Sequence, residues 1–71
     1  MHIATFEITV KGEVDRSVAA ALAPATVTIG GGRTRLRAEA IDQAALHGLL
    51  DRVAELGLAL VSVAEVADDG G

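Results

Sequence analysis

The chain has 71 residues, a formal net charge of −4 and no cysteine, and 51% of its residues are hydrophobic. Because domains usually span roughly 100–200 residues, this length predicts one small domain and excludes a multidomain enzyme. Without cysteine there is no disulfide framework, zinc ribbon or thiolate nucleophile. We expect residues 1–67 to form a single domain and residues 68–71 to form a flexible acidic and glycine tail.

The apolar residues of the chain are mostly small. Alanine accounts for 14 residues, against one phenylalanine and no tyrosine or tryptophan. Burying a large apolar side chain contributes roughly 1.5–3 kcal/mol and an alanine methyl much less, so the predicted core is thin. A monomer with such a core is expected to be only marginally stable, and the composition therefore predicts self-association.

Neither a membrane helix nor a signal peptide is expected. The longest uncharged run, from Ser17 to Gly32, is interrupted by Pro24 and by three glycines. Glu7 and Lys11 interrupt the start of the chain, which excludes the uncharged core of a signal peptide. We therefore expect a cytoplasmic protein without a membrane contact.

The first part of the chain alternates between apolar and polar residues from residue 4 to residue 10, which predicts a half-buried strand. Residues 11–13 follow as a turn. Asp15 is then placed to cap a short helix that runs through Leu22 and ends before Pro24. Two more alternating runs, residues 25–29 and 34–39, are separated by three glycines and predict a hairpin.

The second part begins with Asp42, a candidate N-cap, and Gly57 lies where a helix C-cap requires a left-handed backbone. Between them a helical period of apolar residues predicts one buried face, formed by Leu46, Leu49, Leu50, Val53 and Leu56. Residues 58–66 are apolar on both faces and predict a last strand.

This order of elements is typical of an α+β protein with a ferredoxin-like βαββαβ two-layer sandwich, here with a short first helix. In that topology the first and third strands are central and the fourth lies at an edge. An apolar edge strand favours pairing with another chain. We therefore predict a homodimer, with an interface that also includes a glycine facing away from the apolar stripe of the long helix: Leu58, Leu60, Val61, Val63, Val66 and Gly48.

His47 and Asp51 are four residues apart and share one side of the long predicted helix. Such a pair can orient an imidazole or supply two metal ligands. A zinc site needs three or four ligands, and the other histidine of the chain is His2. An exposed helical pair is the alternative interpretation, and we expect no metal or other cofactor.

Arg33, Arg35 and Arg37 share one face of the third predicted strand, where they could meet phosphates or carboxylates. RNA-binding sheets of similar topology carry stacking aromatics on this face, and this chain has none there. Glu7 and Glu39 are placed to neutralise the arginines, so we expect no nucleic acid partner. The three glycines run between two strands and not into a helix, which favours a hairpin turn over a phosphate loop.

The run Asp-Gln-Ala-Ala-Leu-His-Gly-Leu-Leu at residues 42–50, continued by residues 55–58, resembles small uncharacterised proteins of actinobacteria. The resemblance covers about the C-terminal half, and a Gly-x-Thr-x-Leu pattern at residues 32–36 precedes it. That group has no known activity, cofactor or catalytic residue, so the resemblance implies no role for His47 or Asp51. The chain has Glu39-Ala40 where the group leads us to expect a Gly-Pro pair.

The terminal Gly70-Gly71 is similar to the end of ubiquitin-like sulfur carriers, in which the C-terminal carboxylate is activated and thiolated. The second hairpin and the Asp15 cap depart from the order of elements in those domains. We predict a non-catalytic interaction or regulatory module that acts as a homodimer or with another protein. A sulfur carrier is the alternative.

Overall fold

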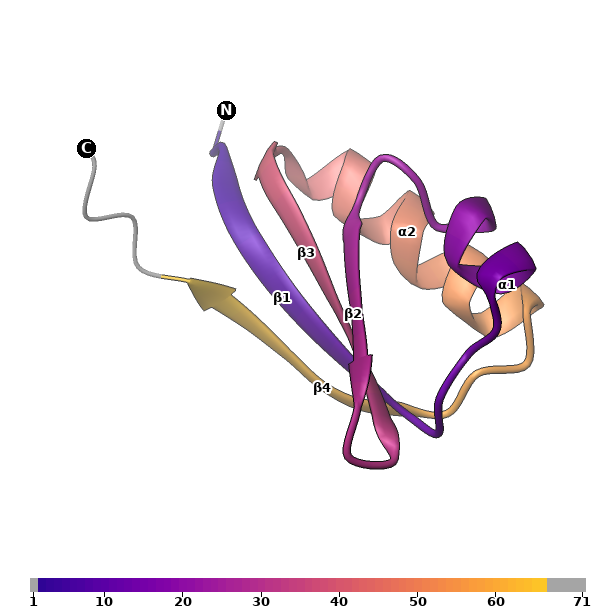
Figure 1. Cartoon of the computed structure of the whole chain (residues 1–71). Coiled ribbons are helices and arrows are strands. Elements are labelled where there is room, and N and C mark those ends of the chain that lie inside the picture. Colours follow the sequence, from indigo (N-terminus) through magenta and orange to yellow (C-terminus); the bar gives the residue numbers. More distant parts are fainter. Residues whose placement is uncertain (1, 67–71) are drawn as a thin grey trace.

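The computed structural model describes residues 2–66, so the predicted tail at residues 68–71 lies outside the described residues. The protein is an α+β fold with a four-stranded antiparallel sheet and two helices (Figure 1). In chain order the elements are β1 (Ala4–Lys11), α1 (Arg16–Ala21), β2 (Thr26–Gly30), β3 (Arg33–Ile41), α2 (Gln43–Glu55) and β4 (Leu60–Val66). The strand order in the sheet is β2-β3-β1-β4, which leaves β2 and β4 at the edges.

The core lies on one face of the sheet, because alternate residues of the two central strands point to that face. Apolar residues from β1, β3, α2 and the end of α1 form one buried cluster: Phe6, Ile8, Val10, Leu22, Leu36, Leu46 and Val53. Since both helices pack against the same cluster, both cover the same face of the sheet (Figure 1). On the other face of the sheet, the two central strands carry polar and charged side chains.

Both helices begin and end where the sequence predicts. The Asp15 carboxylate accepts a hydrogen bond of 2.9 Å from the Val18 backbone N–H, and the Asp42 carboxylate accepts one of 2.8 Å from the Ala45 N–H. These bonds satisfy backbone donors that a helix start leaves without partners. Gly57 has a φ of +74°, which is the left-handed conformation that ends α2 and that glycine adopts without strain.

The short helix α1 contains no buried residue of its own. It is held through its C-cap, Leu22, whose side chain is fully buried in the core. The guanidinium of Arg52 on α2 donates a 3.0 Å hydrogen bond to the Ala21 carbonyl, which joins the ends of the two helices. Packing and not intrinsic helix propensity therefore stabilises this six-residue element.

Thr34 on β3 is the one buried polar residue found among residues 2–66. Its hydroxyl donates a 2.8 Å hydrogen bond to the Gly12 carbonyl and accepts one of 3.1 Å from the Val14 backbone N–H. The loop between β1 and α1 is thereby fastened to the third strand. A buried hydroxyl with both partners present avoids the cost of an unsatisfied polar group.

Several strand boundaries differ from the prediction, by one or two residues each. Lys11 is the last residue of β1 and not part of a turn, and β3 continues to Ile41. Near its end β3 carries a bulge, in which Ala40 adopts a φ of +54°. The strand β4 begins at Leu60 and not at Leu58, whose backbone N–H instead donates a 3.1 Å hydrogen bond to the Val53 carbonyl of α2.

Candidate functional site

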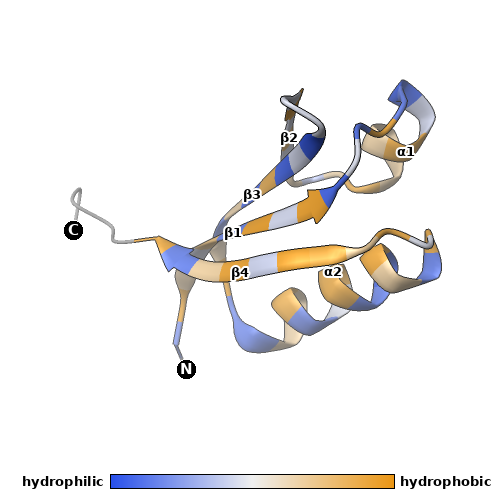
Figure 2. Ribbon diagram, turned by 90° about the horizontal axis from the view of Figure 1, so that it is seen from below, coloured by the Kyte–Doolittle hydropathy of each residue, from blue (hydrophilic) through white to orange (hydrophobic). Residues whose placement is uncertain are grey.

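Strand β4 exposes more large apolar side chains than any other described element. It forms an edge of the sheet, and six of its seven residues are exposed. Leu60, Val61 and Val63 are 51%, 47% and 37% exposed, and we call these three residues the β4 patch. Figure 2 shows β4 as a largely hydrophobic ribbon that runs across the view between β1 and α2. The apolar character that the sequence placed on this strand therefore remains exposed to solvent in the single chain.

The predicted interface residues do not all belong to this patch. Leu58 precedes β4 and is partly buried against the core, and Val66 is also partly buried. Gly48 lies on α2 and lines a shallow hollow with Pro24 and Arg52, near the connection from α1 to β2. None of the residues that line this hollow belongs to β4, so we leave Gly48 out of the β4 patch, and its part in a dimer interface stays a prediction. A Cβ atom added at Gly48 would meet no atom within 4 Å, so no other part of the described chain approaches it.

The backbone edge of β4 is partly protected against strand pairing. Its register shifts by one residue between Thr9 and Val10, which places a bulge at Val61. Glu65 lies opposite the core residue Phe6 and so on the helix side of the strand, where His2 Nε2 lies 3.0 Å from its carboxylate. Bulges and inward-facing charges are devices that oppose edge-to-edge association. The β4 patch is therefore better suited to contacts through its side chains than to strand pairing through its backbone.

His47 and Asp51 both lie on the exposed side of α2, as the helical spacing predicts. The structure brings neither of them to His2, whose ring contacts Glu65 instead. Within residues 2–66 no group of three or more His, Cys, Asp or Glu side chains could hold a metal ion. Among the described residues, the His47 and Asp51 pair is thus not completed to a group of three metal ligands.

The arginines of β3 lie on the polar face of the sheet, opposite the helices. The Arg37 Nε donates a 3.2 Å hydrogen bond to the Glu39 carboxylate, and its Nη1 lies 4.0 Å from the Glu7 carboxylate. The prediction that Glu7 and Glu39 neutralise an arginine is confirmed for Arg37. Arg35 lies between Thr9 of β1 and Thr28 of β2, without an acidic residue opposite it.

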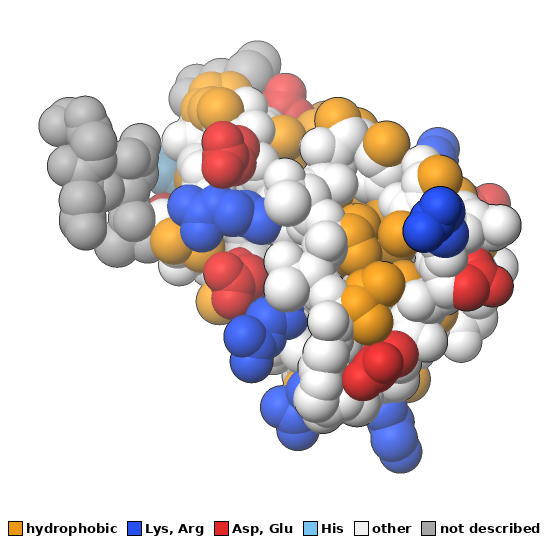
Figure 3. All heavy atoms as spheres, in the orientation of Figure 1, with side chains coloured by type: hydrophobic (Ala, Val, Ile, Leu, Met, Phe, Trp, Pro, Cys, Tyr) orange, Lys and Arg blue, Asp and Glu red, His pale blue; other side chains and the backbone are white. Residues whose placement is uncertain are grey.

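Lys11 is a neighbour of the arginines that the sequence did not predict. In the observed register Lys11 of β1 lies directly opposite Arg33 of β3, and the alternation of β1 puts both on the polar face with Arg35. We call Lys11, Arg33 and Arg35 the cation cluster. Blue side chains gather at the lower end of Figure 3, where the β2–β3 hairpin turns. The sequence contains one signal for this position: the series of polar residues 5, 7 and 9, which share one face of the strand, continues to residue 11.

The three glycines lie at the turn of the β2–β3 hairpin, as predicted. Gly30 ends β2, and Gly31 and Gly32 have φ values of +64° and +77°. Two successive residues with positive φ are typical of a tight two-residue hairpin turn, and glycine adopts this conformation readily. The Gly32 N–H donates a 2.9 Å hydrogen bond to the Glu13 carboxylate, so this amide already has a partner within the chain.

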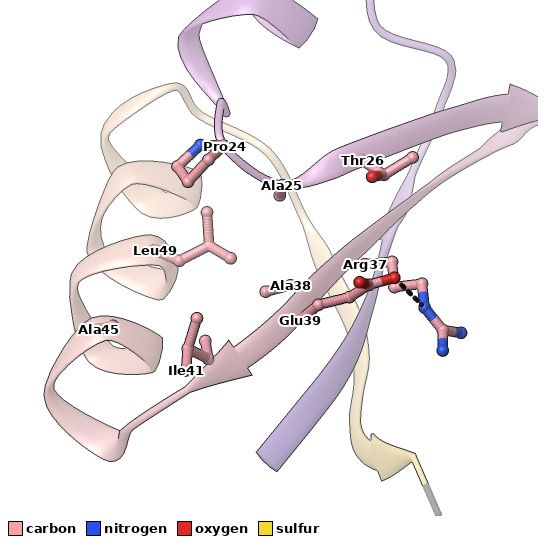
Figure 4. Close-up of a pocket in the computed structure, with 9 residues that line it drawn as sticks. All are labelled: Pro24, Ala25, Thr26, Arg37, Ala38, Glu39, Ile41, Ala45 and Leu49. Atoms are coloured by element: carbon pink, nitrogen blue, oxygen red, sulfur yellow. Dashed lines mark hydrogen bonds and ion pairs between the residues drawn. The ribbon is translucent and has the colours of Figure 1, made fainter. Parts of the chain in front are cut away.

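An open hollow of about 250 Å³ lies where β3 extends beyond β2 (Figure 4). Ile41 and Leu49 point into it from β3 and α2, whereas Arg37 at its margin points away toward the polar face. The lining residues are Pro24, Ala25, Thr26, Arg37, Ala38, Glu39, Ile41, Ala45 and Leu49. Because small-molecule sites usually enclose roughly 300–1,000 Å³, we assign this hollow no ligand.

The fold and these surfaces define a small α+β domain whose most prominent features are an apolar edge strand and a basic sheet face. The chain belongs to the family described as Domain of unknown function (DUF8691), whose model matches residues 5–64. The match includes the run at residues 42–50 on which the resemblance to uncharacterised proteins rested. Neither the curated proteins nor the solved structures contain a match. No helix in the described part of the chain is long and apolar enough to cross a membrane.

Proposed function

We propose that this chain is a ferredoxin-like, cytoplasmic interaction module that acts as a homodimer through the β4 patch. The observation that carries the proposal is the exposure of three large aliphatic side chains on one edge strand, Leu60, Val61 and Val63. The strand order, with the first and third strands central and the fourth at an edge, supports the ferredoxin-like assignment. The cysteine-free sequence is compatible with a reducing compartment.

Burial of the β4 patch would supply a substantial part of the binding free energy. Complete burial of a Val or Leu side chain contributes roughly 1.5–3 kcal/mol, and each of the three side chains is one-third to one-half exposed. Covering what remains exposed therefore adds about 1 kcal/mol per side chain in each copy. Such a gain is large compared with the marginal stability expected of a 71-residue domain.

A second copy of the chain fits this patch by symmetry. A two-fold interface uses the same surface on both subunits, so that surface must be self-complementary and must not set like charges against each other. The three residues of the patch are aliphatic, and Glu65 is the one charged residue of β4. The bulge and Glu65 oppose continuous strand pairing, which favours packing of the two patches against each other by their side chains.

The oligomeric state in solution tests this proposal. Light scattering on a dilution series should show a dimer that dissociates as the concentration falls. Val61→Lys should give a monomer with an unchanged circular dichroism spectrum, because Val61 is half exposed and its replacement leaves the core intact. Ile29→Lys is the matched control, since Ile29 is 43% exposed on the opposite edge strand. A wild-type protein that is monomeric at high concentration contradicts the proposal.

A further inference from the structure

We propose that the cation cluster of Lys11, Arg33 and Arg35 binds a compact phosphate-bearing anion, a phosphate or pyrophosphate group, on the polar face of the sheet. This site is separate from the β4 patch. It lies at the end of the sheet where β1 finishes and the β2–β3 hairpin turns.

The register brings the three cations within reach of one anion. Lys11 and Arg33 are directly opposite on neighbouring antiparallel strands, and residues so placed have Cβ atoms about 4.5–5.5 Å apart. Arg35 follows two residues after Arg33 on the same face, about 6.5–7 Å further along the strand. Long, exposed lysine and arginine side chains can converge on a single group from such positions. Guanidinium groups also match phosphate oxygens with paired hydrogen bonds.

No acidic side chain in the described part of the chain lies within ion-pair distance of the cluster. The ion pairs between described residues are His2 with Glu65 and Arg37 with Glu7 and Glu39. None of them includes a member of the cluster. Glu13 is the nearby acid on the loop after β1, and its carboxylate accepts the hydrogen bond of the Gly32 N–H. Like charges directly opposite each other destabilise a sheet. An anion between Lys11 and Arg33 therefore relieves their repulsion and stabilises the sheet.

Hydroxyl groups lie beside the cations. Across the sheet, Arg35 of β3 is flanked by Thr28 of β2 and Thr9 of β1, and Thr9 is followed by Ser62 of β4. Thr28, Thr9 and Ser62 therefore place three hydroxyl groups beside Arg35 in one row across the sheet. Hydroxyl and cationic donors together are the groups with which proteins contact phosphate oxygens.

The distribution of charge favours a compact anion over a nucleic acid strand. The next row along the polar face holds Arg37 with the carboxylate of Glu7 opposite it, and Glu39 follows on β3. A long polyanion that crossed the face would meet these carboxylates, whereas a single phosphate or pyrophosphate group occupies only the basic end. The absence of aromatic residues at the described outward positions also removes the stacking that single strands use.

Titration with sodium pyrophosphate and with inorganic phosphate at low ionic strength tests the site. In amide NMR spectra of the full chain, the signals of Lys11, Arg33 and Arg35 should move more than those of other residues. Arg35→Gln and Lys11→Gln should each weaken binding about threefold, as expected for an exposed charge contact, and the double variant about tenfold. Added salt should weaken binding by screening.

A stability measurement separates a binding role from a merely structural one. Because Lys11 faces a like charge, Lys11→Gln should raise the unfolding temperature by about 1–3 °C at low salt while it weakens pyrophosphate binding. Arg37→Gln is the matched control on the same face and should leave pyrophosphate affinity unchanged, since Arg37 is paired with Glu7 and Glu39.

Three results overturn the proposal. One is that the amide NMR signals of the cluster do not shift with either phosphate or pyrophosphate. The second is an equal loss of affinity in Arg37→Gln, which reveals general charge attraction. The third is a single-stranded oligonucleotide that binds more tightly than pyrophosphate and moves signals across the whole polar face, which assigns the surface to nucleic acid.

Discussion

Replacing Thr34 by valine should destabilise the protein, although valine has nearly the same shape and is more apolar. Thr34 is 0% exposed, and its hydroxyl makes hydrogen bonds of 2.8 Å to the Gly12 carbonyl and 3.1 Å from the Val14 N–H. Loss of these bonds costs about 1 kcal/mol each, and a buried partner left without a bond adds roughly 1–3 kcal/mol. Because Gly12 and Val14 are only partly buried, water can replace part of what is lost. We therefore expect a net loss of about 2 kcal/mol in the free energy of unfolding.

Urea denaturation at fixed protein concentration, followed by circular dichroism, measures this loss directly. Thr34→Ser is the matched control, because serine retains the hydroxyl and removes one buried methyl at a cost of about 1 kcal/mol. Hydrogen exchange at the Val14 amide should quicken in Thr34→Val and not in Thr34→Ser. A Thr34→Val protein as stable as the wild type, or more stable, would refute the reasoning, because the hydroxyl would then serve no structural purpose.

Three further predictions follow from burial and backbone conformation. Leu60→Ser should weaken the dimer roughly 10–100-fold in sedimentation equilibrium, because two half-exposed leucines lose their contact, whereas Ile29→Ser should leave the dissociation constant unchanged. Leu22→Ala should cost about 3–5 kcal/mol in urea denaturation, since Leu22 is fully buried and anchors α1; a cost below about 1 kcal/mol contradicts that role. Ala40→Gly should raise the unfolding free energy by about 0.5 kcal/mol, since Ala40 is exposed with a φ of +54°, whereas the exposed helical Ala44→Gly should lower it by about 1 kcal/mol. An Ala40→Gly protein that is less stable than the wild type contradicts the strain argument.

Local patterns in the sequence determined the elements of this fold. The alternation along residues 4–10 and the apolar period of α2 predicted a strand and a helix that the structure confirms. Asp15, Asp42 and Gly57 lie at the predicted helix ends, because capping depends on backbone groups a few residues away. The ends of the strands were less predictable. They depend on pairing with distant residues, as does the bulge at Ala40, beyond which Ile41 still pairs with Ala4.

The candidate surfaces depended on contacts that no local pattern contains. Residue type predicted an apolar last strand, yet only the packing of both helices over the centre of the sheet left Leu60, Val61 and Val63 exposed. The sequence grouped Gly48 with β4, whereas in the structure Gly48 lines a hollow with residues of α2 and of the connection from α1 to β2.

The composition of the chain and its residue periods were sufficient to predict one small α+β domain with a thin core. The tertiary structure alone decided which distant residues meet. It set Lys11 opposite Arg33, 22 positions away, and joined the Thr34 hydroxyl to Gly12 across the same interval. The physical reason is that strand register depends on packing and hydrogen bonding between whole strands, and a shift of one residue would move every side chain to the other face. The basic end of the polar face therefore exists only in the folded sheet.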